Sequence, residues 1–224
     1  MHIPDGLIAL PVSVAAVAVA APIVAASTHR AGRQLVDREI PVAGLVVAYL
    51  VVAQLLVFPV GLGTSAHLVG AALALVLVGP AVAITCVSIV LVIQALVLAD
   101  GGITALGLNA LNSGIVPILV GWLVLVVVLR LAGGRRTALP LAAGFAAAAG
   151  VVAGAAAFCL EYAAGGPDAI PVGQVAAGML GGHLVIAAIE GVLTALLVAA
   201  VLRLRPDLVT RWRPTPARSP ELIS

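Results

Sequence analysis

Long apolar runs alternate with short polar stretches along the whole chain. The first two runs cover about residues 7–27 and 41–59, and later runs cover about residues 113–131 and 138–160. A further run ends near Leu202. A helix rises about 1.5 Å per residue, so runs of this length can cross roughly 30 Å of hydrocarbon. The pattern therefore predicts an all-helical integral membrane protein.

One apolar run, residues 68–99, would be nearly 48 Å long as a single helix, which is too long for one crossing. It contains Gly79 and Pro80 in its middle. Every basic side chain is an arginine, and the arginines form three groups: Arg30, Arg33 and Arg38; Arg130, Arg135 and Arg136; Arg203, Arg205, Arg211, Arg213 and Arg218. A reversal at Gly79 places all three groups on one side, and basic residues collect on the cytoplasmic side. We therefore predict seven transmembrane helices, with the N-terminus outside and the C-terminus cytoplasmic.

The segments between the spans have different characters. Residues 29–39 predict a polar inner loop in which His29 is solvated, and residues 61–67 predict a tight outer turn. Residues 100–112 are apolar and rich in glycine, so they predict a re-entrant or capping outer loop, which is tolerated at depth only where protein or a cavity covers it. Residues 161–171 predict another outer loop. The last run, residues 172–202, is overlong for a crossing, so its helix is expected to begin deeper, near Gly181.

Composition agrees with this picture and excludes several classes of protein. Of the 224 residues, 63% are hydrophobic and 9% are charged, against roughly 25% charged residues in soluble domains. Aromatic residues make up 3% and the net charge is +2, so a nucleic-acid surface is not expected. Cys86 and Cys159 lie in apolar runs and are interpreted as small buried hydrophobes.

The first two residues carry the most informative chemistry. The Met1 amine, the amide between Met1 and His2, and the His2 imidazole can close two fused chelate rings with three nearly coplanar nitrogens. His67 is the best candidate for the fourth corner. Planar nitrogen sets favour Ni²⁺ or Cu²⁺ and accept Co²⁺, whereas Mg²⁺ and Ca²⁺ prefer oxygen. On position alone, His2 could equally be an accident of sequence behind the start codon.

Each of the other notable polar residues has two possible roles. Five side chains could orient the ligands or could merely cap helix ends and turns: Ser65, Asp100, Thr104, Asn109 and Asn112. His183 and Glu190 are seven residues apart and share one helical face. His183 is either a further metal ligand or a hydrogen-bonded structural residue, and Glu190 is either structural or an inter-subunit contact. Small residues at four-residue spacing, such as Gly144 and Ala148, indicate close helix packing or a docking face.

The motifs of two enzyme classes are missing. A Walker A motif requires lysine, and the chain has none. A His-Glu-x-x-His zinc motif is also absent, which argues against an intramembrane metalloenzyme. We therefore expect no catalytic residues and no cofactor beyond a transported ion, and any ATP-driven step must come from a partner.

Several motifs together resemble the CbiM and NikM proteins, the substrate-capture components of energy-coupling factor (ECF) transporters for cobalt and nickel. The resemblance covers about residues 1–205. It rests on Met1-His2-Ile3-Pro4-Asp5-Gly6, Gly63-Thr64-Ser65-Ala66-His67-Leu68, Gln94-Ala95-Leu96, Ala99-Asp100-Gly101-Gly102, Thr104-Ala105-Leu106-Gly107 with Asn109 and Asn112, and His183 with Glu190-Gly191. The departure at Ala66, where many relatives have a polar or histidine-like residue, leaves the metal preference open.

The resemblance implies how the protein works. It implies seven transmembrane helices with the N-terminal segment folded into the site, and a metal held by the Met1 amine, the His2 amide and imidazole, and the His67 imidazole. It also implies a transmembrane coupling protein, two ATP-binding-cassette ATPase subunits, a separate small accessory membrane protein where one is needed, and a bacterial or archaeal plasma membrane. The pathway served, cobalamin synthesis or a nickel enzyme, stays open.

The sequence therefore supports one functional hypothesis and one alternative. The hypothesis is high-affinity capture of Co²⁺ or Ni²⁺ at the outer membrane face for ATP-driven uptake, by a single domain spanning residues 1–205. Affinity is expected to fall as the pH drops, because the ligands must be deprotonated. The alternative is a secondary transporter or channel that works alone. Residues 206–224, with four prolines, predict a short disordered cytoplasmic tail.

Overall fold

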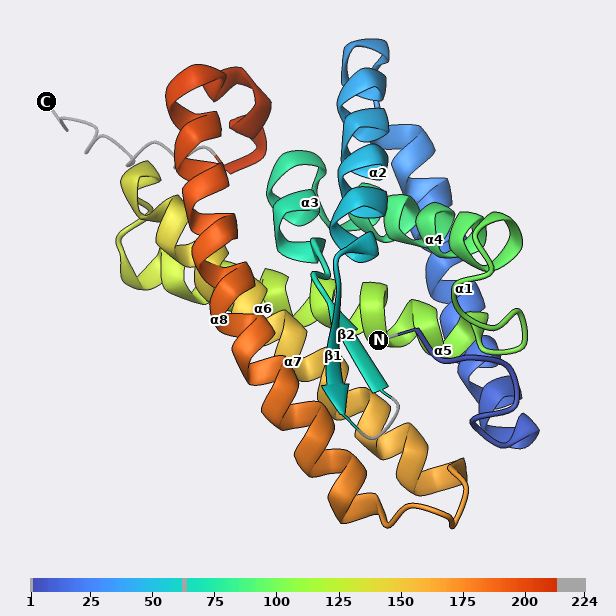
Figure 1. Ribbon diagram of the computed structural model, residues 1–224. Coiled ribbons are helices and arrows are strands. Elements are labelled where there is room, and N and C mark those ends of the chain that lie inside the picture. Colours follow the sequence, from blue (N-terminus) through green and yellow to red (C-terminus); the bar gives the residue numbers. More distant parts are fainter. Residues whose placement is uncertain (1, 62–63, 213–224) are drawn as a thin grey trace, which may run out of the picture.

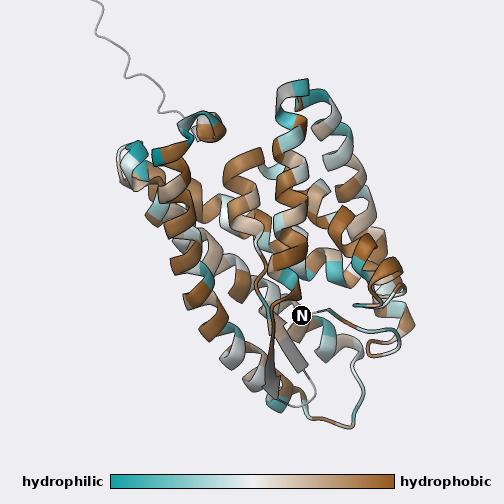
Figure 2. Ribbon diagram, turned by 45° about the horizontal axis from the view of Figure 1, so that its top comes forward, coloured by the Kyte–Doolittle hydropathy of each residue, from teal (hydrophilic) through white to brown (hydrophobic). Residues whose placement is uncertain are grey.

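Helices dominate the computed structural model, which describes residues 2–61 and 64–212 (Figure 1). Five helical stretches are long and apolar enough to cross a membrane: Leu10–Gln34, Pro80–Val97, Leu106–Leu131, Arg136–Gly165 and Val172–Leu204. Most residues on these stretches are hydrophobic (Figure 2). A lipid bilayer accepts such helices because their side chains are apolar and each helix satisfies its own backbone hydrogen bonds. The chain is a multi-pass membrane protein.

The elements follow one another in this order. They are α1 (Leu10–Gln34), η1 (Asp37–Glu39), α2 (Ile40–Leu55), β1 (Val57–Gly61), β2 (Thr64–His67), α3 (Ala71–Val78), α4 (Pro80–Val97), α5 (Leu106–Ala110), the π-helical turn η2 (Leu111–Ile115), α6 (Val116–Leu131), η3 (Arg136–Ala138), α7 (Leu139–Gly165), α8 (Val172–Leu204) and η4 (Pro206–Trp212).

In this predominantly helical chain, a β-hairpin takes the place of the tight turn predicted at residues 61–67. Strands β1 and β2 are antiparallel, with Val57 opposite His67 and Phe58 opposite Ala66. The strand β1 begins within the apolar run that forms α2, so hydropathy alone did not separate the two. The hairpin descends beside α8, away from the end that carries η1 and η4 (Figure 1). It ends at the buried His67.

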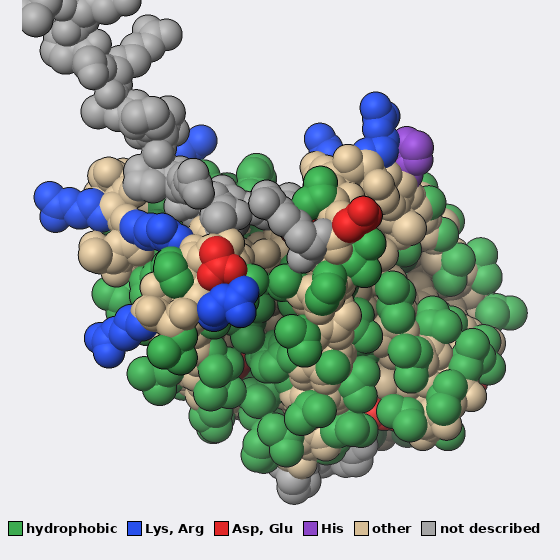
Figure 3. All heavy atoms as spheres, turned by 90° about the horizontal axis from the view of Figure 1, so that it is seen from above, with side chains coloured by type: hydrophobic (Ala, Val, Ile, Leu, Met, Phe, Trp, Pro, Cys, Tyr) green, Lys and Arg blue, Asp and Glu red, His purple; other side chains and the backbone are tan. Residues whose placement is uncertain are grey.

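The predicted break at Gly79 is confirmed, although the two segments on either side are unequal. Gly79 has a φ of 78°, which L-residues with a side chain rarely adopt, and Pro80 begins the next helix. Helix α3 has only 8 residues and α4 has 18. Arginines from different parts of the chain gather on the face seen in Figure 3. This common face agrees with the charge argument that located the break.

Two helices are longer than predicted. Helix α1 continues through the expected polar loop to Gln34, so His29 lies on a helix. Helix α7 reaches Gly165, which places Glu161 on it rather than in an outer loop. Polar residues at the membrane surface continue a helix without cost, because water or headgroups solvate their side chains. Hydropathy therefore marked the hydrocarbon boundary and not the end of each helix.

The predicted re-entrant loop is only partly a loop. Residues 100–105 are irregular, but the chain becomes helical at Leu106 and continues through the π-turn η2 into α6. The span therefore begins at Leu106 and not at residue 113. Gly107 permits this, because a Cβ there would lie 2.5 Å from the backbone nitrogen of Val17 on α1. A short helix packed this closely on α1 is covered by protein, as backbone at membrane depth requires.

Helices α7 and α8 pack closely along their small residues. A Cβ on Gly144 would lie 2.7 Å from the carbonyl oxygen of Gly191, and Ala148 lies beside the same glycine. This stripe therefore serves packing within the chain. Helix α8 is continuous from Val172, so the predicted start near Gly181 is wrong. Glycine inside a helix costs only about 1 kcal/mol relative to alanine, so Gly181 does not prevent the helix from continuing.

The C-terminal segment begins with two short 3₁₀ turns, separated by a kink at Val209 (φ −114°, ψ 34°). In η4, Val209 is fully buried. The carbonyl oxygen of Pro206 accepts a hydrogen bond from the Arg136 guanidinium at 2.7 Å. The prediction of a disordered tail does not hold for residues 206–212. Residues 213–224 lie outside the described part of the chain, where it stays a prediction.

Candidate metal centre

The N-terminal segment is folded into the protein and pinned at Ile3. The Ile3 N–H donates to Asn109 Oδ1 at 2.7 Å, and the Ile3 carbonyl accepts from Asn109 Nδ2 at 3.2 Å and from the Gly102 N–H at 2.8 Å. The Ile3 side chain is 1% exposed. Asn109 therefore acts as a clamp on the backbone beside His2, rather than as a cap on a helix end.

A second contact holds the same segment three residues after His2. The Asp5 carboxylate accepts hydrogen bonds from the Thr104 hydroxyl at 2.6 Å and from the Thr104 N–H at 2.8 Å. These hydrogen bonds lower the pKa of Asp5, so the carboxylate stays ionised at neutral pH. Gly101 has a φ of 90°, and a Cβ there would lie 3.1 Å from Asn109 Nδ2 and 3.4 Å from His2 Cβ. The loop thus closes over the segment only because it carries glycine.

Replacing Asp5 by alanine should loosen residues 2–6 without unfolding the protein. Both bonds from Thr104 are lost, and the pin at Ile3 remains. We expect faster hydrogen exchange at the Ile3 amide and a several-fold weaker affinity for nickel, both measured at neutral pH. Thr104→Val, which keeps the backbone donor, should have a smaller effect on both. Unchanged exchange at Ile3 in the Asp5→Ala variant would show that this contact does not order the segment.

His67, the last residue of β2, meets His2 at the inner end of this segment. The two ring centroids are 4.5 Å apart with an interplanar angle of 33°. His67 Nδ1 lies 2.9 Å from the carbonyl oxygen of Leu68, and His2 Nδ1 lies 3.0 Å from Asp100 Oδ2. Both partners are acceptors, so Nδ1 carries the proton in each ring. Each Nε2 then carries a lone pair, and neither has a hydrogen-bond partner among the described residues.

Burial sets the charge of the two imidazoles. The side chain of His2 is 4% exposed and His67 is 1% exposed. Burial is the main reason that the pKa of His2 is lowered and that the pKa of His67 lies well below its usual value. Both rings are therefore neutral at pH 7. Buried, neutral imidazoles with a free nitrogen are suitable ligands for a transition-metal ion.

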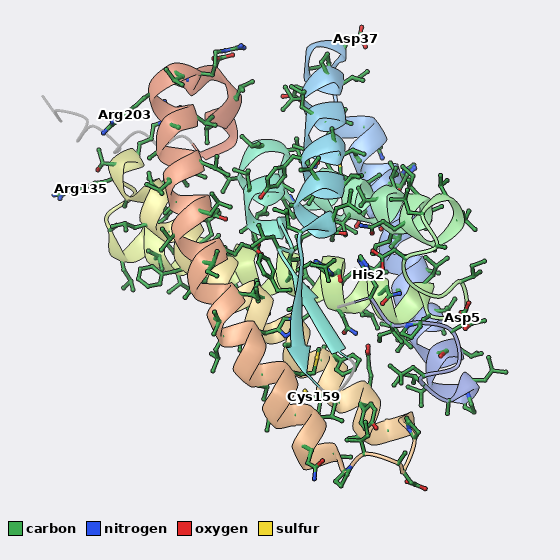
Figure 4. All side chains as sticks on the ribbon, in the orientation of Figure 1. His2, Asp5, Asp37, Arg135, Cys159 and Arg203 are labelled. Carbon is green, nitrogen blue, oxygen red and sulfur yellow. The ribbon has the colours of Figure 1, made fainter. Side chains whose placement is uncertain are left out.

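The structure brings some of the candidate residues together and separates others. His2, His67, Asp100 and Asn109 lie together (His2 is labelled in Figure 4). Asn112 instead donates from Nδ2 to Glu161 Oε2 at 2.6 Å and takes no part in this group. Met1 and the Ser65 side chain lie outside the described part of the chain, so their predicted roles stay predictions.

His183 lies close to the pair without joining it. It is fully buried, and Nδ1 lies 2.7 Å from the Met179 carbonyl oxygen. Its ring interacts electrostatically with His67, and its Nε2 has no partner within the described residues. In residues 2–61 and 64–212, no three His, Cys, Asp or Glu side chains converge as a metal site. The described side chains thus bring two imidazoles together, those of His2 and His67.

Comparison with known proteins identifies the family. The family described as CbiM, cobalt uptake substrate-specific transmembrane region, matches residues 2–208. The chain belongs to the CbiM family. The matched range contains the pinned N-terminal segment, the hairpin and all eight α-helices.

Relatives of this CbiM family member carry names of metal transport. It is 36% identical over 154 residues to a putative metal transport protein of Haloquadratum walsbyi, covering 69% of this chain and 68% of the relative. It is 38% identical over 169 residues to the fused nickel transport protein NikMN of Rhodobacter capsulatus, covering 69% of this chain and 48% of that protein. The cobalt transport protein CbiM of Geobacter sulfurreducens is 32% identical over 165 residues, 70% of this chain and 46% of the relative. The chain thus spans about half the length of the last two.

Two solved structures have the same fold. A crystal structure of a truncated transition metal transporter superposes with a TM-score of 0.83 at 25% identity, over 91% of this chain and 99% of that one. A crystal structure of a transition metal transporter superposes with a TM-score of 0.81 at 26% identity, over 91% and 93% of the two chains. The arrangement of helices and hairpin in this CbiM family member is therefore one already seen in metal transporters.

Three residues near the centre were missed or undervalued at the sequence level. Gln54 on α2 is fully buried and donates from Nε2 to the Val69 carbonyl oxygen at 3.2 Å. Gln94 on α4 is also fully buried, and Glu190 on α8 binds the backbone just after His67. A lone polar side chain within an apolar run is the signal that could have found the two glutamines, because such residues are costly in a membrane and usually functional.

Proposed function

We propose that this CbiM family member captures a Co²⁺ or Ni²⁺ ion near the outer membrane face. The observation that carries the proposal is the pair of buried, neutral imidazoles of His2 and His67, held 4.5 Å apart by an N-terminal segment folded into the protein. Borderline-soft nitrogen ligands select late transition metals over Mg²⁺ and Ca²⁺. The Met1 amine and the His2 amide nitrogen complete a set of four nitrogens around the ion.

The proposed orientation places the site outside. The hairpin and the N-terminal segment lie toward the end of the protein opposite the arginine-rich face (Figures 1 and 3). With that face cytoplasmic, the N-terminus is external and the chain crosses the membrane seven times when the short α2 and α3 are counted. An ion captured there comes from outside the cell.

Capture requires a rearrangement of the His2 ring. A chelate ring that includes the His2 amide nitrogen must close through Nδ1, because Nε2 is on the far side of the imidazole. Nδ1 lies beside Asp100 at 3.0 Å, with its proton directed to the carboxylate. Binding of the ion therefore turns the ring about its Cβ–Cγ bond, transfers the imidazole proton from Nδ1 to Nε2, releases the amide proton of His2 to solvent, and frees Asp100. Asp100 then serves the metal-free state, in which it keeps the segment folded in.

The proposed transport step is ATP-driven, with this chain as the substrate-specific component of an ECF transporter. The transmembrane coupling protein and the ATPase subunits are separate chains in this proposal. The alternative is a secondary transporter or channel that works alone. Within the described residues, Glu190 is the one fully buried carboxyl group, and both of its oxygens accept backbone hydrogen bonds. A proton relay along the bundle needs a series of titratable side chains, so this arrangement argues against the alternative.

Binding and uptake measurements test the two parts separately. Purified protein with its native N-terminus should bind one Ni²⁺ or Co²⁺ per chain in calorimetry, and excess Mg²⁺ should not compete. Absence of binding would overturn the proposal. For transport, metal accumulates in cells only when coupling protein and ATPases are coexpressed. Accumulation with this chain alone would favour the secondary transporter or channel.

A further inference from the structure

Glu190 makes two short hydrogen bonds to the backbone beside the metal centre. It lies in the interior of α8 and is 1% exposed. Its Oε2 accepts from the Val69 N–H at 2.6 Å, and its Oε1 accepts from the Gly70 N–H at 2.9 Å. Hydrogen bonds between N–H groups and a carboxylate are stronger than those between neutral groups. Glu190 thus fixes the short connection between β2 and α3.

The Glu190 carboxylate is the acceptor for both N–H groups of this connection. Gly70 precedes α3 with a φ of 73°, and a Cβ there would lie 2.8 Å from the Leu50 side chain. The first N–H groups of a helix have no partner within it, and a buried N–H without a partner is costly. The carboxylate also lies at the positive end of the α3 dipole.

The Val69 N–H belongs to the same peptide group as the Leu68 carbonyl. That carbonyl oxygen accepts the hydrogen bond from His67 Nδ1 at 2.9 Å. A continuous chain therefore runs from the Glu190 carboxylate through one peptide group to the His67 imidazole. A carboxylate that accepts from the N–H polarises the peptide, and its oxygen becomes a better acceptor for the imidazole proton. The free Nε2 is at the far end of this chain.

The other side of the Val69 residue is also held. Its carbonyl oxygen accepts from Gln54 Nε2 at 3.2 Å, and Gln54 is fully buried on α2. Side chains from α2 and α8 therefore both hydrogen-bond to the connection between β2 and α3. His67 is thus oriented by two residues that are distant from it in sequence. Gln54 lies 13 residues before His67, and Glu190 lies 121 residues after Val69.

We propose that Glu190 is a positioning residue for the metal centre: through the Leu68–Val69 peptide group it fixes the orientation and tautomer of His67 and strengthens Nε2 as a metal ligand. The role is that of the carboxylate that commonly supports a metal-bound histidine, here acting through a peptide group instead of by direct contact. The inference rests on the proposed function, because it assigns Glu190 to the same site.

A double-mutant cycle tests this role. Glu190→Gln keeps the size of the side chain but removes its charge and one acceptor. We expect it to weaken Ni²⁺ and Co²⁺ binding by about 10–100-fold, the usual effect of losing a supporting partner. In a His67→Ala background the same substitution should change the affinity by less than about threefold, because the two residues act as one unit. An equal effect in both backgrounds would overturn the proposal.

A matched control and a spectrum separate positioning from general destabilisation. Glu161→Gln makes the same chemical change at the other membrane carboxyl group, whose partner Asn112 lies apart from the centre, and should leave affinity unchanged. The visible absorption of the nickel-loaded protein should shift in Glu190→Gln, because a weaker Nε2 donor changes the ligand field. An unshifted spectrum together with a lower thermal midpoint would indicate a purely structural role.

Two further outcomes keep the result unambiguous. If Glu190→Gln does not fold, Glu190→Asp retains the charge but shortens the reach, and it should weaken binding with the same spectral shift. Tight binding with an unchanged spectrum in Glu190→Asp would overturn the proposal. Wild-type binding that depends on His67 but not on Glu190 would overturn this inference alone. Absence of wild-type binding, or binding indifferent to His67, would instead overturn the proposed function.

Discussion

We expect acetylation of the Met1 amine to abolish nickel and cobalt binding. Acetylation converts the primary amine into an amide, which is a far poorer ligand, and it opens the chelate ring that the amine closes. It also crowds a segment in which His2 and Ile3 are already buried. We expect affinity to fall by more than about a thousandfold, which corresponds to roughly 4 kcal/mol.

Calorimetry on two preparations measures this effect. Both come from one batch of protein with Met1 as its first residue, and one half is treated with an amine-selective acetylating reagent. The chain has no lysine, so the reagent acts on the N-terminal amine. The mock-treated half is the matched control and should bind like the native protein. Equal affinity in the acetylated and mock-treated proteins would show that the amine is not a ligand, and the site would then have to be sought around His67, His183 and Asp100.

The second large effect is expected from His67→Ala. This change removes the ligand contributed by the hairpin, and the void cannot be filled by the fixed backbone around it. The loss of metal affinity should be larger than the roughly 10–100-fold loss that follows removal of a supporting partner, because a direct ligand is removed. His67 is fully enclosed, so the apo protein should also lose some thermal stability.

His29→Ala is the control for this experiment. His29 is exposed on α1, close to Arg30 and Arg33 at the end of that helix remote from the centre. We expect it to bind nickel and cobalt like the wild type. If His67→Ala binds as tightly as His29→Ala, then His67 is not a ligand, and the short distance between the His2 and His67 rings reflects packing alone.

Hydropathy and charge were sufficient for the membrane class and for the break at Gly79. They failed where a helix continues past the hydrocarbon, as at Gln34, and where a strand follows a helix within one apolar run, as at Val57. Both failures have the same cause. Hydropathy reports the solvent that a side chain prefers, but backbone conformation in an apolar run depends on which partner accepts its hydrogen bonds.

The same distinction applies to the metal centre. His2, His67 and the loop containing Asp100 and Asn109 were identifiable from residue chemistry. The role of Glu190 was not, because its partners are backbone N–H groups 120 and 121 residues away, which carry no signature in their side chains. Asn112 shows the reverse: its type and position suggested the centre, but α7 provides Glu161 as its partner.

The sequence by itself determined the membrane class and the family and named candidate nitrogen ligands, because hydropathy, charge and donor atoms are properties of single residues. The tertiary structure decided how these residues meet. It placed the hairpin inside the bundle, pinned Ile3 to Asn109, and connected Glu190 to His67 through a peptide group. These contacts join distant segments, and their geometry depends on helix packing that no local pattern encodes.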